Sequence, residues 1–359
     1  MTFNLWKTLL GSVALAVTVT MAGSAMAQDA LAFKEGLEPA PGAQDVAPPA
    51  KPKSGPFKIG FSNISVVNTW RVQMAEEAKF EASRHKEIAD FLMTDAGGSS
   101  SKQVSDIEDL LARGVDALVI APGSPTALNP VIEKAAKQGV PVFVFNSDVT
   151  TNAITSRLVA DERYFGQAGA EYLVEQMGHK GSIIGLRGIA GMSIDDDRWN
   201  AAMDVFKKYP DIKVIDSAFG EWAYDKGKQI CESLVLGHPQ IDGIWSSGGA
   251  MTQACAETLN DNGRKLVPMT GEGNNGFLRV WQEMKLNTIA PIDPTWLSAE
   301  AVKAALRYLE GQPIKNGYLS KPKPITKDDL GSYYKADLND SYWVGSILPE
   351  SQLKTLYAK

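Results

Sequence analysis

Residues 116–146 read DALVIAPGSPTALNPVIEKAAKQGVPVFVFN and contain the unit that decides the fold. Apolar runs rich in β-branched residues lie at 116–121 and 140–146, and a stretch predicted to be helical lies between them at 126–138. A strand followed by a helix and another strand is typical of a crossover between parallel strands. This unit therefore predicts a parallel sheet covered by helices.

The same alternation extends from this unit in both directions. Before it, strands are predicted at 57–62 and 88–94, and helices at 70–85 and 101–112, the latter with Ser101 as its cap. After it, a short strand at 157–160 leads into a second series. Its strands are predicted at 181–186, 213–219, 241–246 and 265–270, and its helices at 163–177, 196–208, 223–236, 249–262, 275–285 and 296–310. Because these units exceed one small sheet, the predicted class is α/β with two doubly wound parallel-sheet lobes and a cleft between them.

The first 56 residues have a different character. Residues 1–27 combine Lys7, an apolar run over 9–19 and the small-residue triplet 25–27, which is the pattern of a cleaved secretory signal peptide. The mature chain is then expected to begin at Gln28 and to be exported. Residues 28–56 are rich in proline and alanine without an apolar period, so we interpret them as an extended tether.

Charge and cysteine usage exclude some classes of function. Lys and Arg total 36 against 42 Asp and Glu, and they are scattered, so nucleic acid is not an expected partner. The three histidines occur singly and show no metal-ligand spacing, so no metal is predicted. Cys231 and Cys255 could form a disulfide in an oxidising compartment, but we favour two buried thiols, since a chain of this length has ample core without a cross-link.

One segment combines several features of a binding site. Residues 181–199, GSIIGLRGIAGMSIDDDRW, run from an apolar strand through a glycine-spaced loop into the start of a helix that carries Arg198. Glycines allow the backbone to approach a bound molecule closely. The Arg198 guanidinium offers several donors in a fixed fork and keeps its charge near neutral pH. Nothing in the segment supplies a nucleophile or a titrating base.

Polar and aromatic residues recur where the predicted strands end. In open parallel sheets ligands bind beyond the carboxyl ends of the strands. Amides, carboxylates and arginines can satisfy the hydroxyl groups of a sugar, and an indole face can cover its C–H surface. The predicted ligand-binding residues are Asn68, Trp70, Arg71, Asn146, Asp161, Arg198, Trp222, Gly248, Glu272 and Asp293.

Over residues 57–320 the chain resembles the ribose-type periplasmic sugar-binding proteins that serve ABC importers. The resemblance is carried by FKIGFSNISVVNTW, LLARGVDALVIAP, KQGVPVFVFNSD, VADERYFGQAGAEYL, RGIAGMSIDDDRW, HPQIDGIWSSGGAMTQACAETL and NGRKLVPMTGEG. It implies the type I periplasmic binding protein fold, with an N-terminal lobe of residues 57–160 and 292–322. The C-terminal lobe and tail would comprise 161–291 and 323–359.

The resemblance also implies roles for individual residues. Asn68 and Trp70 match the first-loop amide and stacking aromatic, and Trp222 matches the second stacking position. Asp161 matches the hinge-proximal carboxylate, and Arg198 matches the sugar-binding arginine. Four other positions differ from the ribose-type pattern. Ser147 replaces an arginine, Gly248 replaces an asparagine, Gly273 replaces an aspartate and Pro291 replaces a glutamine.

The predicted function is capture of a pentose, hexose or related polyol by lobe closure about segments near 158–161, 291–294 and 321–326, followed by delivery to an ABC permease. The protein is expected to be a periplasmic monomer without catalytic activity or cofactor. Residues after 325, including Tyr342 and Trp343, are expected to pack across the hinge rather than to cover the ligand. The alternative is a binding protein for an acidic sugar or a small polar signal molecule that serves a chemoreceptor or sensor.

Two enzyme classes are weaker alternatives. Residues 271–276, GEGNNG, match G-x-G-x-x-G with Asp293 about 20 residues on, as in NAD-dependent oxidoreductases. Too little chain follows to complete a dinucleotide-binding half, and Glu272 would repel a pyrophosphate. A glycosidase would need two facing carboxylates, for which Asp161 and Glu272 are the candidates. The acidic run 195–197 is explained by its place at a helix start and needs no calcium ion.

Overall fold

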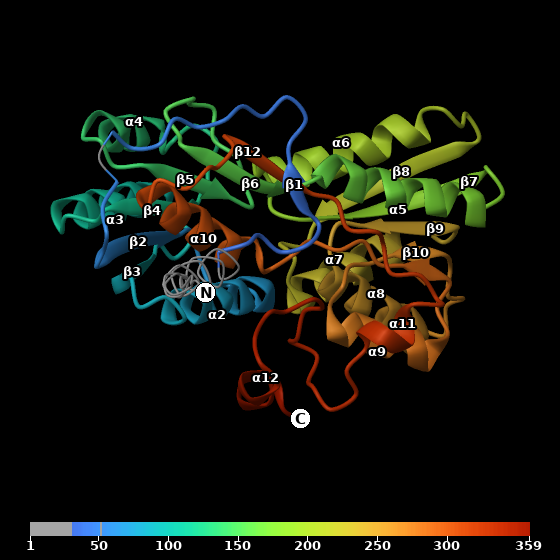
Figure 1. Ribbon diagram of the computed structural model, residues 1–359. Coiled ribbons are helices and arrows are strands. Elements are labelled where there is room, and N and C mark those ends of the chain that lie inside the picture. Colours follow the sequence, from blue (N-terminus) through green and yellow to red (C-terminus); the bar gives the residue numbers. More distant parts are fainter. Residues whose placement is uncertain (1–30, 51) are drawn as a thin grey trace, which may run out of the picture. The chain divides into compact units, whose positions relative to one another are not determined.

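Strands and helices alternate through the chain as predicted, and the α/β fold class is confirmed (Figure 1). A computed structural model describes residues 31–50 and 52–359; the predicted signal peptide at 1–27 lies outside them. Between residues 57 and 160 the elements are β2 (Phe57–Asn63), α2 (Thr69–Ser83), β3 (Ile88–Asp95), α3 (Ser100–Ala112), β4 (Ala117–Ala121), α4 (Asn129–Lys137), β5 (Val142–Phe145) and β6 (Ser156–Ala160).

The second series begins directly after β6. Its elements are α5 (Glu162–Gln176), β7 (Gly181–Arg187), α6 (Ser193–Phe206), β8 (Ile212–Phe219), α7 (Tyr224–Gly237), β9 (Gly243–Ser246), α8 (Gly249–Asp261), β10 (Met269–Thr270), α9 (Asn275–Met284) and β11 (Thr288–Ile289). After it come α10 (Leu297–Leu309), β12 (Gly317–Ser320), α11 (Leu330–Tyr333) and α12 (Glu350–Tyr357). Helix α3 is capped by Ser99, whose hydroxyl accepts from the Lys102 amide, so the prediction of Ser101 as the cap is wrong.

Two sheets organise these elements. The N-terminal lobe is built on a seven-stranded sheet, in which β1 (Leu37–Pro39) is the first strand of the order β1-β12-β6-β5-β4-β2-β3. The C-terminal lobe is built on a five-stranded sheet of order β11-β10-β9-β7-β8. From β2 to β6 and from β7 to β11 the pairings are parallel, and both sets follow the same doubly wound order. Strands β4 and β5 are buried at every residue because helices cover both faces of the sheet.

Over residues 52–359 the chain passes between the two lobes at three places. It leaves the first sheet after β6 and enters α5, and it returns between β11 and α10, which packs on α2, β4, β5 and β6. It leaves again after β12, where the backbone of Ile325 pairs with Ala290 beside β11. These crossings coincide with the segments predicted as hinges.

Because both sheets share the doubly wound order, each has a topological switch point. It lies between β2 and β4 in the N-terminal lobe and between β7 and β9 in the C-terminal lobe, and ligands bind beside such points.

The segment interpreted as a tether is paired with the N-terminal lobe. Strand β1 (Leu37–Pro39) lies antiparallel to β12, with Leu37 opposite Ser320. Farther along, Asp45 forms a bridge to Lys315, and the Val46 amide donates to the Ile314 carbonyl. The interpretation of residues 28–56 as an extended tether is therefore wrong for Leu37–Pro39, Asp45 and Val46, which are paired with the sheet or with the residues beside it. An edge strand needs only backbone groups, so a segment without apolar periodicity can still extend a sheet.

The two cysteines form a disulfide, which corrects the prediction of free thiols. Cys231 lies on α7 and Cys255 on α8, and these helices pack against each other with 5.3 Å between the two Cα atoms. Both residues are fully buried in the core of the C-terminal lobe. The pairing depends on the packing of two helices, which the separation of the residues along the chain did not reveal.

Within the described part of the chain, no helix combines the length and apolar character needed to cross a membrane.

Candidate ligand-binding cavity

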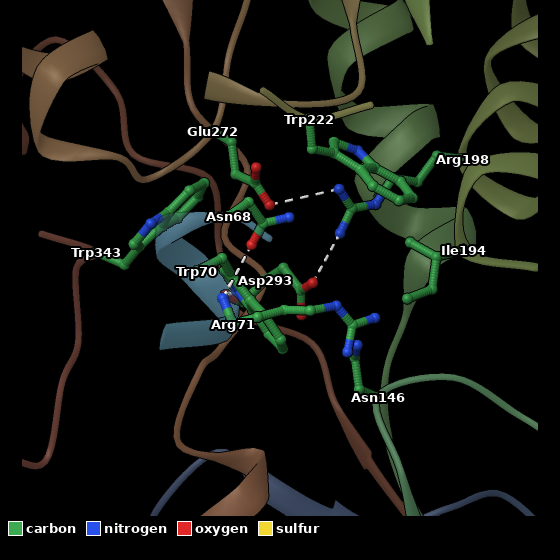
Figure 2. A pocket seen from close by; sticks show the side chains of 10 residues that line it. All are labelled: Asn68, Trp70, Arg71, Asn146, Ile194, Arg198, Trp222, Glu272, Asp293 and Trp343. Atoms are coloured by element: carbon green, nitrogen blue, oxygen red, sulfur yellow. Dashed lines mark hydrogen bonds and ion pairs between the residues drawn. The ribbon is translucent and has the colours of Figure 1, made fainter. Parts of the chain in front are cut away.

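A cavity with about 370 Å³ of empty volume lies where the strand ends of the two lobes meet (Figure 2). Its walls come from both lobes and from the C-terminal tail. The lining residues are Asn68, Trp70, Arg71, Asn146, Ile194, Arg198, Trp222, Glu272, Asp293 and Trp343. Eight of the ten residues predicted from the sequence are in this set.

The start of α2 supplies the N-terminal lobe's side chains. Asn68 is the helix cap, and its side-chain oxygen accepts from the Arg71 amide at 2.9 Å. This cap fixes the first turn, which directs Trp70 and Arg71 toward the cavity. The Trp70 Nε1 donates to the carbonyl oxygen of Asp293 at 3.0 Å, and the Arg71 Nη1 donates to Asn63 Oδ1 at 3.3 Å.

Arg198, on α6, is bound by three carboxylates. Its Nε donates to Glu162 at 2.6 Å, its Nη2 to Asp293 at 3.0 Å and its Nη1 to Glu272 at 3.4 Å. Nη1 also donates to the Ser247 carbonyl at 2.8 Å, and the guanidinium lies over the Phe165 ring, 3.7 Å from its centroid. The side chain is therefore held in one orientation, with one edge toward the cavity (Figure 2).

Burial dominates the electrostatics of these carboxylates. It raises the pKa of Glu272 to about 8, against the opposing influence of Arg198, and raises the pKa of Glu162 by the same cause. Burial also raises the pKa of Asp293, and it lowers the pKa of Arg71 to about 10. Despite its own burial, the pKa of Arg198 is raised by the three carboxylates around it. The cluster thus holds more acidic than basic groups, and it retains protons at pH values where exposed carboxyl groups would lose them.

Two lining residues adopt left-handed backbone conformations. Asn146 follows β5 with a φ of 65°, and Trp222 follows β8 with a φ of 54°. Such angles are unfavourable for residues other than glycine, asparagine and aspartate, and they often mark functional sites. The Trp222 Nε1 donates to Ser247 Oγ at 2.8 Å and to the Ser247 carbonyl at 3.0 Å. With its polar atom engaged, the indole offers its ring surface to the cavity.

Some buried oxygen atoms around the cavity have no partner among the described residues. They are Oδ1 of Asn146, Oδ1 of Asp293 and Oε1 of Glu162. The first two belong to side chains that line the cavity. A buried acceptor without a hydrogen bond is costly, so each is a position where a hydroxyl donor of a ligand would be favourable.

Two predicted site residues lie elsewhere. Asp161 caps α5, where its Oδ1 accepts from the Tyr164 amide at 2.9 Å and its Oδ2 lies 3.4 Å from Lys321 Nζ. This position places Asp161 outside the set of residues that line the cavity, whereas Glu272 is one of them. Gly248 lies behind Trp222, since a Cβ at this position would meet the indole. It makes room for the ring and is not part of the wall.

Three residues were missed by the sequence analysis. Glu162, next to the predicted Asp161, forms the shortest of the Arg198 ion pairs. Ile194 lies one turn before Arg198 on α6, so its helical spacing was a usable signal. Trp343, which the sequence predicts to pack across the hinge, lines the cavity instead. That expectation is therefore wrong in excluding Trp343 from the ligand's surroundings.

The loop that matches G-x-G-x-x-G is covered by protein. A Cβ at Gly271 would meet Phe277, one at Gly273 would meet Val344, and one at Gly276 would meet Gln253 and Asp340. These glycines allow close packing within the C-terminal lobe, and Glu272 between them points to Arg198. The acidic run 195–197, at the start of α6, also has protein partners, because Asp195 accepts from Arg187 and from the Gly188 amide. In the described residues, no group of three or more His, Cys, Asp or Glu is placed to hold a metal ion.

Comparisons with known proteins show the family to which the chain belongs. A family model described as a periplasmic binding protein domain matches residues 59–313, so the chain belongs to the periplasmic binding protein family. The chain is 26% identical over 259 residues to the ribose import binding protein RbsB of Bacillus subtilis, which covers 72% of this chain and 84% of that protein. The resemblance to ribose-type binding proteins is thereby confirmed.

Two further proteins show the extent of the similarity. The xylitol-binding protein of Mycolicibacterium smegmatis is 28% identical over 239 residues, 66% of this chain and 68% of that protein. The fold is shared with the arabinose-binding component of an ABC transporter from Shewanella sp. ANA-3, at a TM-score of 0.71 and 22% identity. That match covers 77% of this chain and 93% of the solved one.

Proposed function

We propose that this protein captures a monosaccharide, either a pentose or a hexose, or a related polyol in the cavity and delivers it to an ABC-type permease. The observation that carries the proposal is the pair of unpartnered acceptors, Asn146 Oδ1 and Asp293 Oδ1, in a small cavity walled by indoles. Hydroxyl groups are donors that match both acceptors, and the C–H face of a sugar or polyol matches Trp70 and Trp222. The family and its ribose- and xylitol-binding members support the same ligand class.

Binding in this proposal requires both lobes. Each lobe supplies part of the cavity wall: the N-terminal lobe supplies Trp70, Arg71 and Asn146, and the C-terminal lobe supplies Arg198, Trp222 and Glu272. A ligand therefore contacts the whole wall only when the lobes are closed. The ligand then stabilises the closed form by contacts that the open form lacks. The chain crossings near 158–161, 291–294 and 321–326 are the proposed hinges. The closed surface is what a permease would recognise.

An acidic sugar is the less favoured ligand. Arg198 is already bound by three carboxylates, and the pKa values of Glu272 and Asp293 are raised by burial. A ligand carboxylate would add negative charge to a buried site with more acidic than basic groups. A neutral polyhydroxyl compound avoids that cost. In this proposal the protein binds and releases its ligand without chemical change.

The proposed location is the periplasm, after cleavage of residues 1–27. The family supports that location, and amino-terminal sequencing of the exported protein is expected to start at Gln28. Delivery to a permease predicts that deletion of the gene abolishes uptake of the ligand. If uptake persists while chemotaxis or induced expression is lost, a chemoreceptor or sensor is the partner instead.

A calorimetric screen of pentoses, hexoses, polyols and sugar acids tests the ligand class. We expect at least one neutral compound to bind and the sugar acids to bind more weakly. Asn146→Gly removes the amide while keeping the left-handed backbone, and loss of one hydrogen bond is expected to weaken binding by about 2- to 10-fold. The matched control is His179→Gly, because His179 has a φ of 64° and lies outside the cavity. The proposal fails if no neutral compound binds or if both variants bind as the parent does.

A further inference from the structure

The C-terminal tail contains a segment that is bonded to both lobes. We call residues 338–348 the strap; they lie beyond residues 59–313, which the family model matches. Toward the C-terminal lobe, the Tyr342 carbonyl accepts from the Asn275 amide at 2.8 Å, and the Val344 amide donates to the Gly273 carbonyl at 2.9 Å. Val344 packs into the core of that lobe at the place left open by Gly273.

The residue between those two, Trp343, is bonded to the N-terminal lobe. Gln73 on α2 accepts from the Trp343 amide at 2.9 Å and donates to its carbonyl at 3.0 Å. The Trp343 Nε1 donates to Thr69 Oγ1 at 2.8 Å. Farther along, Ser346 donates to Glu77, also on α2, at 2.5 Å. Gln73 and Glu77 are fully buried, so these contacts are shielded from water.

The strap therefore fixes the Trp343 ring at one end of the cavity. Figure 2 shows this indole on the opposite side of the cavity from Ile194 and Arg198. Next to it an outer groove with about 890 Å³ of empty volume shares Asn68 and Trp222 with the cavity, and Thr69 and Ser341 also line it. Thr69 is the hydrogen-bond partner of Trp343, so the indole lies beside the boundary between cavity and groove.

We propose that Trp343 is the end wall of the cavity and sets the maximum length of the ligand. The strap holds it by bonding to both lobes. The inference rests on the proposed function and narrows the class of ligand: the site binds a free monosaccharide or polyol and rejects its glycosides. Loss of the indole joins the cavity to the outer groove, where a second ring or an O-linked substituent then finds room.

Selectivity between a free sugar and its glycosides tests this role. The probes are the monosaccharide or polyol that the parent protein binds best, its methyl glycoside or ether, and a disaccharide that contains it. We expect Trp343→Ala to bind the free ligand at least tenfold more weakly and to bind the longer probes more tightly than the parent does. Trp343→Leu is a second variant with a shorter apolar side chain, should the alanine variant fold poorly.

Two controls separate the wall from its support. Trp343→Phe keeps a ring at the end of the cavity, and Thr69→Val removes the hydrogen bond to Nε1 but leaves the indole, so both are expected to keep rejecting the longer probes. The proposal is overturned if Trp343→Ala and Trp343→Leu rank free and extended ligands as the parent does. It is also overturned if Thr69→Val accepts glycosides as readily as Trp343→Ala.

A measurement without ligand tests the strap even if the proposed function is wrong. Asp109 on α3 and Leu236 on α7 are 65% and 83% exposed and lie in different lobes, so both can be replaced by spin-labelled cysteines. The two native cysteines are bonded to each other and do not react. Gln73→Leu, which removes both hydrogen bonds to the Trp343 backbone, is expected to broaden the distance distribution between the labels.

The matched control is Gln103→Leu. Gln103 is also fully buried, but its amide bonds to Ser62, Ala121 and Gly123 within the N-terminal lobe, so the distribution should stay as in the parent. If the parent and Gln73→Leu show the same distribution of label distances, the strap does not hold the two lobes together. If the parent binds none of the sugars or polyols, the proposed function fails. The distances between the spin labels then still test whether the strap holds the two lobes together.

Discussion

Arg198 is only 1% exposed, and its bonds to three carboxylates make it a structural as well as a binding residue. Its charge compensates part of the cost of burying Glu162, Glu272 and Asp293. The sequence pointed to the guanidinium as a donor for ligand hydroxyls. The contacts show that most of its donors are used inside the protein, so at the scale of one residue the main effect of its loss is on folding.

Replacement of Arg198 by alanine is expected to lower the free energy of unfolding by about 3–5 kcal/mol, because the buried carboxyl groups of Glu162, Glu272 and Asp293 lose the cation to which they are bonded. Urea unfolding measures the change. The control is Arg163→Ala, since Arg163 is 55% exposed and pairs with Asp204 on the surface. Such exposed pairs contribute at most about 1 kcal/mol. Equal losses in the two variants would contradict the role given to the buried cluster.

The raised carboxyl pKa values predict how stability depends on pH. Glu272 has a pKa of about 8 in the folded chain against an ordinary value of 4.5, so between these values the folded state binds more protons than the unfolded state. The free energy of unfolding therefore falls as the pH rises from about 5 toward 8.

Glu272→Gln is neutral in both states and should flatten this dependence. A tenfold change in proton affinity is worth about 1.4 kcal/mol. We therefore expect the fall in the free energy of unfolding between pH 5.5 and pH 8.5 to be smaller in this variant by at least about that amount. Urea midpoints across the range measure it. The same slope in the parent and in Glu272→Gln would show that this carboxyl group does not carry the proton.

At the scale of elements, the site depends on how α5 and α6 cross. Gly166 on α5 faces the backbone of Arg198 on α6 so closely that a Cβ would collide with the Arg198 carbonyl oxygen. This close approach brings Glu162, at the start of α5, within 2.6 Å of the Arg198 Nε. A small residue in one helix thus positions an ion pair between two helices.

Gly166→Ala is expected to destabilise the protein by about 1–3 kcal/mol, as other overpacked positions do, and to weaken ligand binding by moving Arg198. The control is Gly237→Ala on α7, where an added Cβ meets nothing within 4 Å. That variant should be neutral or up to about 1 kcal/mol more stable, because alanine restricts the unfolded chain. Thermal unfolding together with calorimetric titration measures both effects; equal stability of the two variants contradicts the close helix crossing.

At the scale of the whole molecule, two doubly wound sheets with separate cores are joined by three chain crossings and by the strap. A ligand that contacts both lobes should therefore stabilise both. At a free concentration 100 times its Kd, it adds about 2.7 kcal/mol to the free energy of unfolding. We expect amide hydrogen exchange to slow in α2 of one lobe and in α8 of the other. Protection confined to a single lobe would contradict binding between them.

Much of this architecture was predictable because its signals are local. Apolar runs such as β4 and β5 record burial on both faces, and the residues that follow parallel strands gather at one edge of each sheet. That rule placed Asn146, Arg198 and Trp222 at the cavity wall. The choice between Asp161 and its neighbour Glu162 was not predictable, because it depends on which of them caps α5.

By itself the sequence determined the alternation of strands and helices, the two lobes and the strand ends at which a ligand would lie. Periodicity and strand order are sufficient for these features, since each depends on short segments. Only the tertiary structure decided the partners of Arg198, the bond between Cys231 and Cys255, the pairing of β1 and the place of Trp343. Each of these joins segments that meet only after folding, as in the hydrogen bonds between Gln73 and Trp343, 270 residues apart. Such contacts leave no periodic trace in either segment.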